Sequence, residues 1–218
     1  MLIVGDGGLG LAVLAARAAA DPGSGRDGGR DGGAVVWVPP IWGDGTGEAR
    51  ASAGAVIADR FGFEFVDADP WRAVPDELER GEASGACLDA MLRRAGWIAR
   101  RLGCARVAWD ACPGSAAGRG GEVIDPRATP DLDAVGATLD RALLVARLVN
   151  LDAGAGVIRI DAPLADLTDW QLADLAADLE APIDRVWWWR GEHPTGASAR
   201  ARWMAALGEV GWAGLVGR

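Results

Sequence analysis

The sequence predicts a three-layer α/β/α protein with a mainly parallel five-stranded sheet. Two observations predict this class: short apolar segments alternate with longer amphipathic ones, and capping residues mark the ends of several amphipathic segments. Short strands that are apolar throughout are typical of a parallel sheet whose two faces are both covered by helices. The expected strands are Leu2–Val4, Ala34–Val38, Phe63–Val66, Arg106–Trp109 and Val157–Ile160.

The amphipathic segments predict helices between these strands. The first, Leu9–Ala20, is alanine-rich and follows a glycine-rich turn, and the second is expected over Glu48–Phe61. A flexible low-complexity loop, Asp21–Gly33, separates the first helix from the second strand. A third helix is expected over 88–102, because apolar residues repeat there at helical spacing, with Gly103 as its C-terminal cap.

Three further helices are expected in the second half of the chain. Thr129 and Pro130 are residue types expected at an N-cap and at the first helical position. The face of the helix that follows them is expected to contain Leu132, Val135, Leu139, Leu143, Ala146 and Val149. Thr168 and Gln171 predict a capping box at the start of the next helix, and the last helix is expected over Ser198–Val210.

Composition limits the domain organisation and the function classes. The chain has 218 residues, and we expect one domain over 1–218, with a core over 1–185 and a C-terminal tail over 186–218. The net charge is −9 and every basic residue is an arginine, so binding to DNA or RNA is not expected. The longest apolar segments are too short to cross a membrane, and the three cysteines make no disulfide framework. With no secretion signal at the start, we expect a cytoplasmic protein.

The loops that follow the strands are expected to carry the site. Right-handed crossovers would bring these loops to one edge of the sheet, where ligands bind in folds of this class. The candidate side chains at this edge are Trp42, Asp44, Asp110, Asp161 and Asp166. Asp161 and Asp166 could form an acid/base pair, but an acidic residue before a capped helix also favours the helix N-terminus.

The turn between the first strand and the first helix is a candidate phosphate-binding loop. Its glycines expose backbone N–H groups, and the helix N-terminus adds a partial positive charge. The candidate residues are Asp6, Gly7, Gly8, Leu9, Gly10 and Leu11. Because the spacing is neither G-x-x-x-x-G-K-[ST] nor G-x-G-x-x-G, a tight turn without a ligand is the alternative, and a dinucleotide-binding oxidoreductase is disfavoured.

Several stretches resemble one known family. Residues 158–189, IRIDAPLADLTDWQLADLAADLEAPIDRVWWW, are similar to the segment TPL-x-DLTKAEI-x-RLG-x-ELG-V of the 7-cyano-7-deazaguanine synthases of queuosine biosynthesis. Residues 129–142, TPDLDAVGATLDRA, look like that family's YPDCRPEFIEAFNKA, and Trp42-Gly43-Asp44 stands where the family has YGQRH. The resemblance implies the Rossmann-like fold of the PP-loop ATP-pyrophosphatases, which are adenine nucleotide alpha hydrolase-like proteins, and it implies a homodimer.

The residues that carry the family's chemistry differ in this chain. The family's Ser-Gly-Gly-x-Asp-Ser is replaced by residues 6–11, so both hydroxyls are missing and the carboxylate of Asp6 takes the first position. A carboxylate about 4 Å from a phosphate costs roughly 4 kcal/mol at an effective dielectric constant near 20, unless a magnesium ion bridges the two groups. The family's Ala-Arg-Asn is replaced by Ala86-Cys87-Leu88.

The positions of the family's four zinc-binding cysteines also differ. Here these positions hold Trp189, Thr195, Ser198 and Ala201, and none of these side chains is a zinc ligand. Zinc is therefore not expected, and no other cofactor is certain. ATP and magnesium are expected only if the reaction of the family persists.

Trp187, Trp188 and Trp189 are consecutive, so they cannot all face one side of a helix or strand. Without zinc, the C-terminal segment needs another anchor, and we expect the indoles to supply it or to form an interface with a protein partner. A stacking platform for a flat ligand is the alternative. His193 is expected in an exposed loop, because nothing places it beside a cysteine as a Cys–His pair requires.

The sequence leaves two functions open. The first is a degenerate synthase-like protein, a pseudoenzyme without catalytic residues, that binds a nucleotide, a flat heterocycle or a protein partner. The second is an active ATP-dependent ligase that adenylates a carboxylate, using Asp6 and magnesium with Asp44 or Asp110. We favour the first, because the apolar helix faces and caps are kept while the residues for ATP and zinc are replaced together.

Overall fold

A five-stranded parallel sheet forms the centre of the computed structural model, which describes residues 1–21, 33–40, 44–66, 85–113, 125–151, 156–191 and 193–212. The strands are β1 (Leu2–Val4), β2 (Val35–Trp37), β3 (Glu64–Val66), β4 (Arg106–Trp109) and β5 (Arg159–Asp161). Their order is β3-β2-β1-β4-β5, and all neighbouring pairs are parallel. In the central register, Ile3 lies between Val36 and Ala108.

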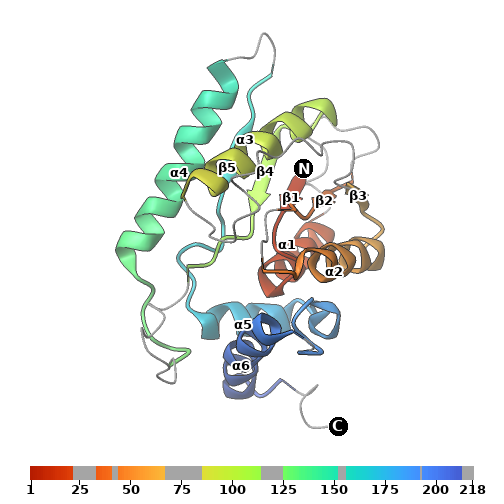
Figure 1. The fold of residues 1–218 in the computed structure, drawn as a ribbon, viewed down its shortest axis with the longest axis vertical. Helices are drawn as coiled ribbons and strands as arrows, with labels where there is room; N and C mark the ends of the chain where they lie inside the picture. The colour runs from red at the N-terminus through yellow and green to blue at the C-terminus, as the bar shows by residue number, and fades with distance from the viewer. Residues whose placement is uncertain are drawn as a thin grey trace.

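Helices cover both faces of the sheet (Figure 1). One layer contains α1 (Leu9–Ala20), α2 (Gly47–Arg60), α5 (Asp169–Asp178) and α6 (Pro194–Glu209), and the other contains α3 (Gly85–Arg101) and α4 (Leu132–Leu151). A 3-10 turn, η4 (Ile183–Arg185), lies between α5 and α6. The expected class, a three-layer Rossmann-like α/β/α fold with a parallel five-stranded sheet, is confirmed.

The central strands are buried on both faces, which explains their apolar sequences. Ile3 and Val36 pack into the layer of α1, α2, α5 and α6, whereas Leu2, Val4 and Trp37 pack against α3 and α4. Every residue of β1 and β2 is buried. A strand in this position needs apolar residues at every place, so continuous apolar runs rather than alternation mark it in the sequence.

The helix ends agree with the expected caps in some places and differ in others. The capping box of Thr168 and Gln171 is present, and Gly103 follows α3 with a positive φ of 71°. The expected cap at Thr129 is wrong: the Asp131 side chain accepts the N–H of Asp133 at 3.0 Å, because a carboxylate placed two residues later reaches the first turn of α4.

The C-terminal helix starts earlier than expected. α6 begins at Pro194 rather than Ser198, since Pro194 fits the first helical position, where no N–H is needed. His193 is its N-cap, accepting the N–H of Thr195 at Nδ1 over 3.3 Å. His193 therefore lies outside the helix, as expected, but it is half-buried rather than exposed.

Some expectations lie outside the described residues. They include Trp42, most of the low-complexity loop at 22–32, and residues 114–124 of the loop after β4. In the part of the chain that the structure describes, no helix has the length and apolar character needed to cross a lipid bilayer.

Replacing Asp131 by alanine should lower the free energy of unfolding by about 1 kcal/mol, because the first turn of α4 loses its side-chain acceptor. Thr129→Ala is the matched control and should change it by less than about 0.5 kcal/mol, since Thr129 is exposed and precedes the observed cap. Urea unfolding followed by circular dichroism measures both. Equal losses for the two variants would contradict the assignment of the cap.

Candidate functional site

The sheet has its topological switch point between β1 and β4. From β1 the chain runs outward to β2 and β3 on one side, and β4 and β5 lie on the other side. Ligands of open parallel sheets bind in the crevice at the carboxyl ends of the strands beside such a point. Asp110 follows β4 directly and Asp6 lies two residues after β1, and the backbone N–H of Asp6 donates to Oδ2 of Asp110 at 3.0 Å. The switch point therefore holds two acidic side chains.

The Asp6 carboxylate lies in the middle of the first turn and accepts three hydrogen bonds. Its Oδ1 accepts the backbone N–H of Gly8 at 2.7 Å. Its Oδ2 accepts Nη1 of Arg50 at 2.7 Å and the indole Nε1–H of Trp187 at 3.3 Å. A glycine-rich turn before a helix normally offers such donors to an external anion. In this chain the turn holds an anion of its own, the Asp6 carboxylate.

Arg50 of α2 compensates the charge of Asp6 from a buried position. Only 4% of Arg50 is exposed. Its Nε donates to Oγ1 of Thr46 at 2.6 Å, and its Nη2 lies 3.4 Å from Oδ2 of Asp44. The guanidinium carbon also lies 3.8 Å from the ring centre of Trp187, so the cation stacks on the indole. Two carboxylates, a hydroxyl and an aromatic face together hold this buried charge.

The ionisation of Asp44 and Asp110 differs. Burial raises the pKa of Asp44, but the hydrogen bonds from Thr46 and the charge of Arg50 outweigh it, and the net pKa lies below its ordinary value. Burial and then the neighbouring Asp6 carboxylate raise the pKa of Asp110 well above its ordinary value. Asp110 thus favours the protonated form.

Two glycines let the chain approach these side chains closely. A Cβ atom at Gly5 would lie 2.1 Å from Oδ2 of Asp110, and one at Gly7 would lie 2.4 Å from the backbone oxygen of Arg50. Gly7 also has a φ of 75°, a conformation that favours glycine. These two positions therefore accept no side chain without moving the network.

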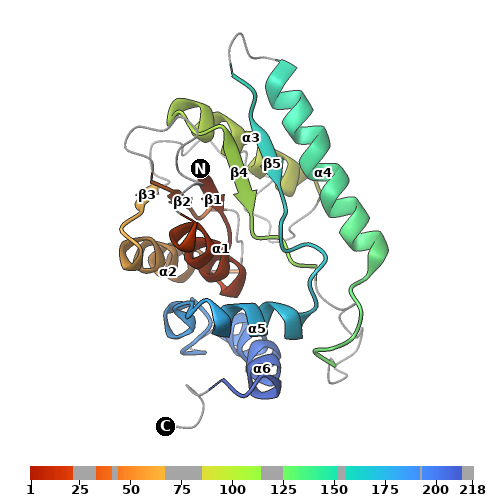
Figure 2. The same ribbon diagram turned by 180° about the vertical axis from the view of Figure 1, so that it is seen from behind.

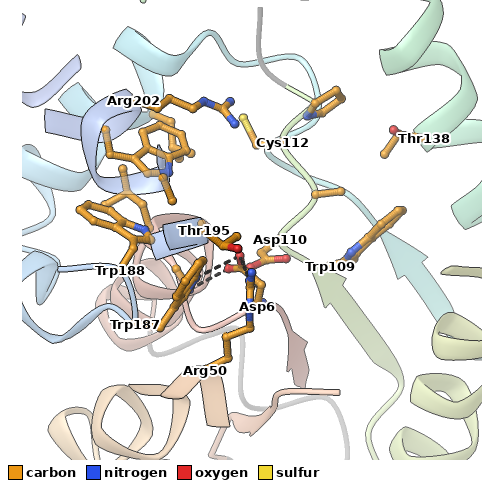
Figure 3. Close-up of a pocket in the computed structure, with 18 of the residues that line it drawn as sticks. Asp6, Arg50, Trp109, Asp110, Cys112, Thr138, Trp187, Trp188, Thr195 and Arg202 are labelled. Carbon is orange, nitrogen blue, oxygen red and sulfur yellow. Dashed lines mark hydrogen bonds and ion pairs between the residues drawn. The ribbon is translucent and has the colours of Figure 1, made fainter. Parts of the chain in front are cut away.

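A cavity of about 660 Å³ opens beside this network (Figure 3). That volume is within the range of small-molecule sites. Its wall is formed by the start of α1, the residues after β4, and side chains of α4, α5 and α6. The aromatic and basic side chains that line it are Trp109, Trp187, Trp188, Trp203, Arg50, Arg141 and Arg202.

Two of the arginines that line the cavity, Arg202 and Arg141, form ion pairs with aspartates on neighbouring helices. Arg202 of α6 donates to both oxygens of Asp169 on α5, with Nε at 2.6 Å from Oδ2. Asp169 is only 1% exposed, so this pair fixes α6 against α5. Arg141 of α4 lies 2.7 Å from Oδ1 of Asp89 on α3. The cavity thus has basic walls whose charges are already partly compensated.

The three consecutive tryptophans occupy different environments. Trp188 is 1% exposed and lines the cavity, and its buried Nε1–H has no hydrogen-bond partner within the described part of the chain. Trp187 lines the cavity and stacks on Arg50, and its backbone N–H donates to the carbonyl of Gly7 at 3.1 Å. The Trp189 ring packs edge-on against Trp212, with ring centres 5.6 Å apart. As expected, the three indoles do not share one face.

The structure brings together part of the expected site. Asp6, Gly8, Leu9, Gly10 and Asp110 line the cavity. Leu11 is fully buried in the core, and Asp44 reaches the site only through Arg50.

Asp161 and Asp166 do not belong to the cavity wall. Asp161 instead lies 2.7 Å from Nε of Arg106 on the neighbouring strand, and Asp166 is exposed. Trp42 lies outside the described residues. Asp161, the last residue of β5, and Asp166, which follows the strand, therefore do not contribute to the site at the switch point.

Arg50 is the central residue of the site among those that sequence reasoning missed, which also include Trp109, Arg141, Arg202 and Trp203. Its signal was present, because Arg50 occupies the buried face of α2 together with Ala53, Gly54, Ile57 and Ala58. A charged residue on a buried helix face needs a partner. The sequence does not identify that partner, since Asp6 is 44 residues away. Ser198 and Thr195 of α6 also line the cavity, at positions that the family resemblance assigned to cysteines.

Comparisons with known proteins do not assign this chain to a family. A scan against protein-family models finds no match, and a search of curated proteins finds none. Within the described residues, no three histidine, cysteine, aspartate or glutamate side chains form a group that could hold a metal ion. The fold and the site geometry therefore define a Rossmann-like α/β protein with a cavity at its switch point.

Arg50→Met should lower the free energy of unfolding by about 3 kcal/mol, because Asp6 and Asp44 lose their buried counter-charge. Arg106→Met is the matched control, since Arg106 forms an exposed pair with Asp161 and should contribute less than about 1 kcal/mol. Chemical denaturation at neutral pH measures both variants. A loss for Arg50→Met as small as for Arg106→Met would contradict the role of Arg50.

Asp110→Asn should stabilise the protein more as the pH rises above about 4. In the unfolded chain Asp110 loses its proton near pH 3.9, whereas the raised pKa retains it in the folded state. The folded state then binds more protons than the unfolded state, so stability falls with rising pH in wild type. Asparagine removes this penalty and keeps an acceptor for the Asp6 N–H. Unfolding free energies at pH 5, 7 and 8.5 test this, and a difference that shrinks with pH would contradict it.

Proposed function

We propose that this protein is a degenerate relative of the 7-cyano-7-deazaguanine synthases that acts by binding, without the ATP-dependent synthase reaction. The observation that carries the proposal is the Asp6 carboxylate in the first turn, with its bonds to Gly8, Arg50 and Trp187. The family to which the sequence is similar has a hydroxyl at this position. A hydroxyl donates to a phosphate, and a carboxylate repels one.

The energetic consequence for a triphosphate is large. One like-charge contact at about 4 Å costs roughly 4 kcal/mol at an effective dielectric constant near 20, which corresponds to about a thousandfold in affinity. The donors that would offset this cost are engaged, because the N–H of Gly8, the guanidinium of Arg50 and the indole of Trp187 already bind Asp6. ATP would have to displace Asp6 from all three.

The rest of the cavity supports a flat ligand with hydrogen-bond acceptors. Indoles of Trp109, Trp187, Trp188 and Trp203 line it, and aromatic rings stack on planar molecules. The Nε1–H of Trp188 is a buried donor at the cavity wall without a hydrogen-bond partner in the described part of the chain. A buried donor without a partner lowers the stability of the fold, so an acceptor on a ligand would be favoured there. A flat heterocycle fits this combination better than a triphosphate. A protein partner that binds through Trp187–Trp189 stays a prediction.

An active ATP-dependent ligase is the second candidate, and the adjacency of Asp6 and Asp110 at the switch point favours it. A magnesium ion bound there would turn the repulsion of a phosphate into attraction. Two observations weigh against it. Arg50 already neutralises Asp6, and the raised pKa of Asp110 makes this carboxyl a weak metal ligand.

Calorimetry with the purified protein tests the proposal. Wild type should bind ATP with a Kd above about 1 mM, with or without magnesium, and should catalyse no ATP–pyrophosphate exchange. Asp6→Ser restores a hydroxyl and frees Arg50, so it should bind ATP at least about tenfold more tightly. Asp166→Ser, an exposed position outside the cavity, is the matched control and should behave as wild type.

The same titrations include 7-carboxy-7-deazaguanine as a flat heterocycle. Binding of this compound without ATP binding would support the proposal. If wild type binds ATP only with magnesium, and Asp6→Ala loses this binding, the binding-protein proposal is wrong and the ATP-dependent ligase takes its place.

A further inference from the structure

Trp187 belongs to the walls of two cavities. One is the cavity at the switch point, and the other, of about 510 Å³, lies between the start of α2 and the segment that joins α5 to α6. Figures 1 and 2 both show this segment beside α2. We call the second space the His193 cavity, and its polar and aromatic wall includes Thr46, Ser52, Arg185, Trp189, Arg190 and His193. Its volume is also within the range of small-molecule sites.

The ring of His193 presents a hydrogen-bond donor to this cavity. Its Nδ1 accepts the backbone N–H of Thr195 at 3.3 Å, so in the neutral ring the proton is on Nε2. A Cβ atom at Gly45 would lie 3.6 Å from this Nε2. Because residue 45 is a glycine, it has no side chain to cover the nitrogen. An acceptor on a ligand in the cavity can therefore reach Nε2.

The charged side chains of the wall add an excess of positive charge. Arg185 and Arg190 line the cavity, and Asp184 is the acidic side chain among the described residues of the wall. Nε of Arg185 lies 3.3 Å from Oδ2 of Asp184 in an exposed pair, which contributes little. Arg190 has no ion pair with any residue that the structure describes. In a chain with a net charge of −9, this local excess of basic groups indicates an anionic ligand.

The backbone adds to this positive potential, because the N-termini of two helices meet at the cavity. Thr46 and Ala49 belong to the start of α2, and His193 and Gly196 belong to the start of α6. The N-cap of α2 makes no side-chain hydrogen bond to its helix, so the first N–H groups of α2 have no side-chain acceptor. The partial positive charge of both helix ends supports the arginines and the imidazole in attracting an anion.

Two indoles and an apolar strip of α2 complete the wall. Trp187 and Trp189 line the cavity together with Ala49, Ala53 and Val56. Aromatic side chains favour planar rings as neighbours. The cavity therefore combines a cationic part with an aromatic part.

We propose that the His193 cavity binds a small aromatic phosphate monoester. Its phosphate oxygens accept hydrogen bonds from Nε2 of His193 and from Arg190, and its ring lies against the indoles of Trp187 and Trp189. A phosphate monoester carries nearly two negative charges and three acceptor oxygens, which matches several cationic donors better than a carboxylate does. Asp6 and Asp110 do not line this cavity, so the proposal does not depend on the function proposed for the switch point.

The single histidine of the chain makes a site-specific test possible, since its Hε1 resonance reports the His193 cavity and not the cavity at the switch point. Phenyl phosphate should shift this resonance of the full chain saturably, with a Kd below about 1 mM. Inorganic phosphate and phenol each lack one half of the ligand and should bind at least about tenfold more weakly. An unchanged resonance, or inorganic phosphate binding as tightly as phenyl phosphate, would overturn the proposal.

Variants of the two donors test their part in binding. Arg190→Gln removes one cation, and His193→Asn removes the Nε2 donor but keeps an N-cap side chain for α6, so each should weaken phenyl phosphate binding by about tenfold. Arg93→Gln makes the same charge change on an exposed part of α3, outside the cavity, and is the matched control that should bind as wild type does.

The His193 resonance measures binding by Arg190→Gln and Arg93→Gln, and calorimetry measures it for His193→Asn. Circular dichroism shows whether each variant is folded. Wild-type affinity in both Arg190→Gln and His193→Asn would contradict the proposal, and so would an equal loss in Arg93→Gln and Arg190→Gln.

Discussion

The Asp6 carboxylate is the point at which three distant parts of the chain meet. It belongs to the turn after β1, it binds Arg50 of α2, and it accepts the indole N–H of Trp187 before α6. Asp6, Asp44 and Thr46 surround Arg50 and stabilise its charge in this buried position. The identity of one turn residue therefore decides whether α2 and the C-terminal segment can pack as they do.

This arrangement also fixes the electrostatics of the crevice. The Asp6 carboxylate pairs with Arg50, and next to burial it is the second cause that raises the pKa of Asp110. Two acidic groups can share the switch point because one carries the compensated charge and the other favours its proton. A ligand entering the cavity meets a built-in anion, a neutral acid and aromatic walls. Under the proposed function, these properties would favour flat, hydrogen-bonding molecules over highly charged ones.

How much the sequence predicts depends on the range of the interactions involved. The strands and most helices were predictable, because apolar periodicity and caps such as Thr168 are local signals. Asp6 and Asp110 were predictable as ligand-edge residues, since parallel strands place their following loops together. The Arg50–Asp6 pair was not, because it joins residues from different elements and depends on how closely α2 approaches the turn. The buried Arg50 on an apolar helix face signals a partner without naming it.

The tryptophans and the α4 leucines show a second limit of periodicity. Apolar residues in the sequence indicate burial, but they do not indicate whether the same chain provides the cover. Trp188 is covered within its own chain by the core that includes α5 and α6. Leu139 and Leu143 extend the apolar arc of α4 beyond the width of the sheet, and among the described residues no element lies there to cover them.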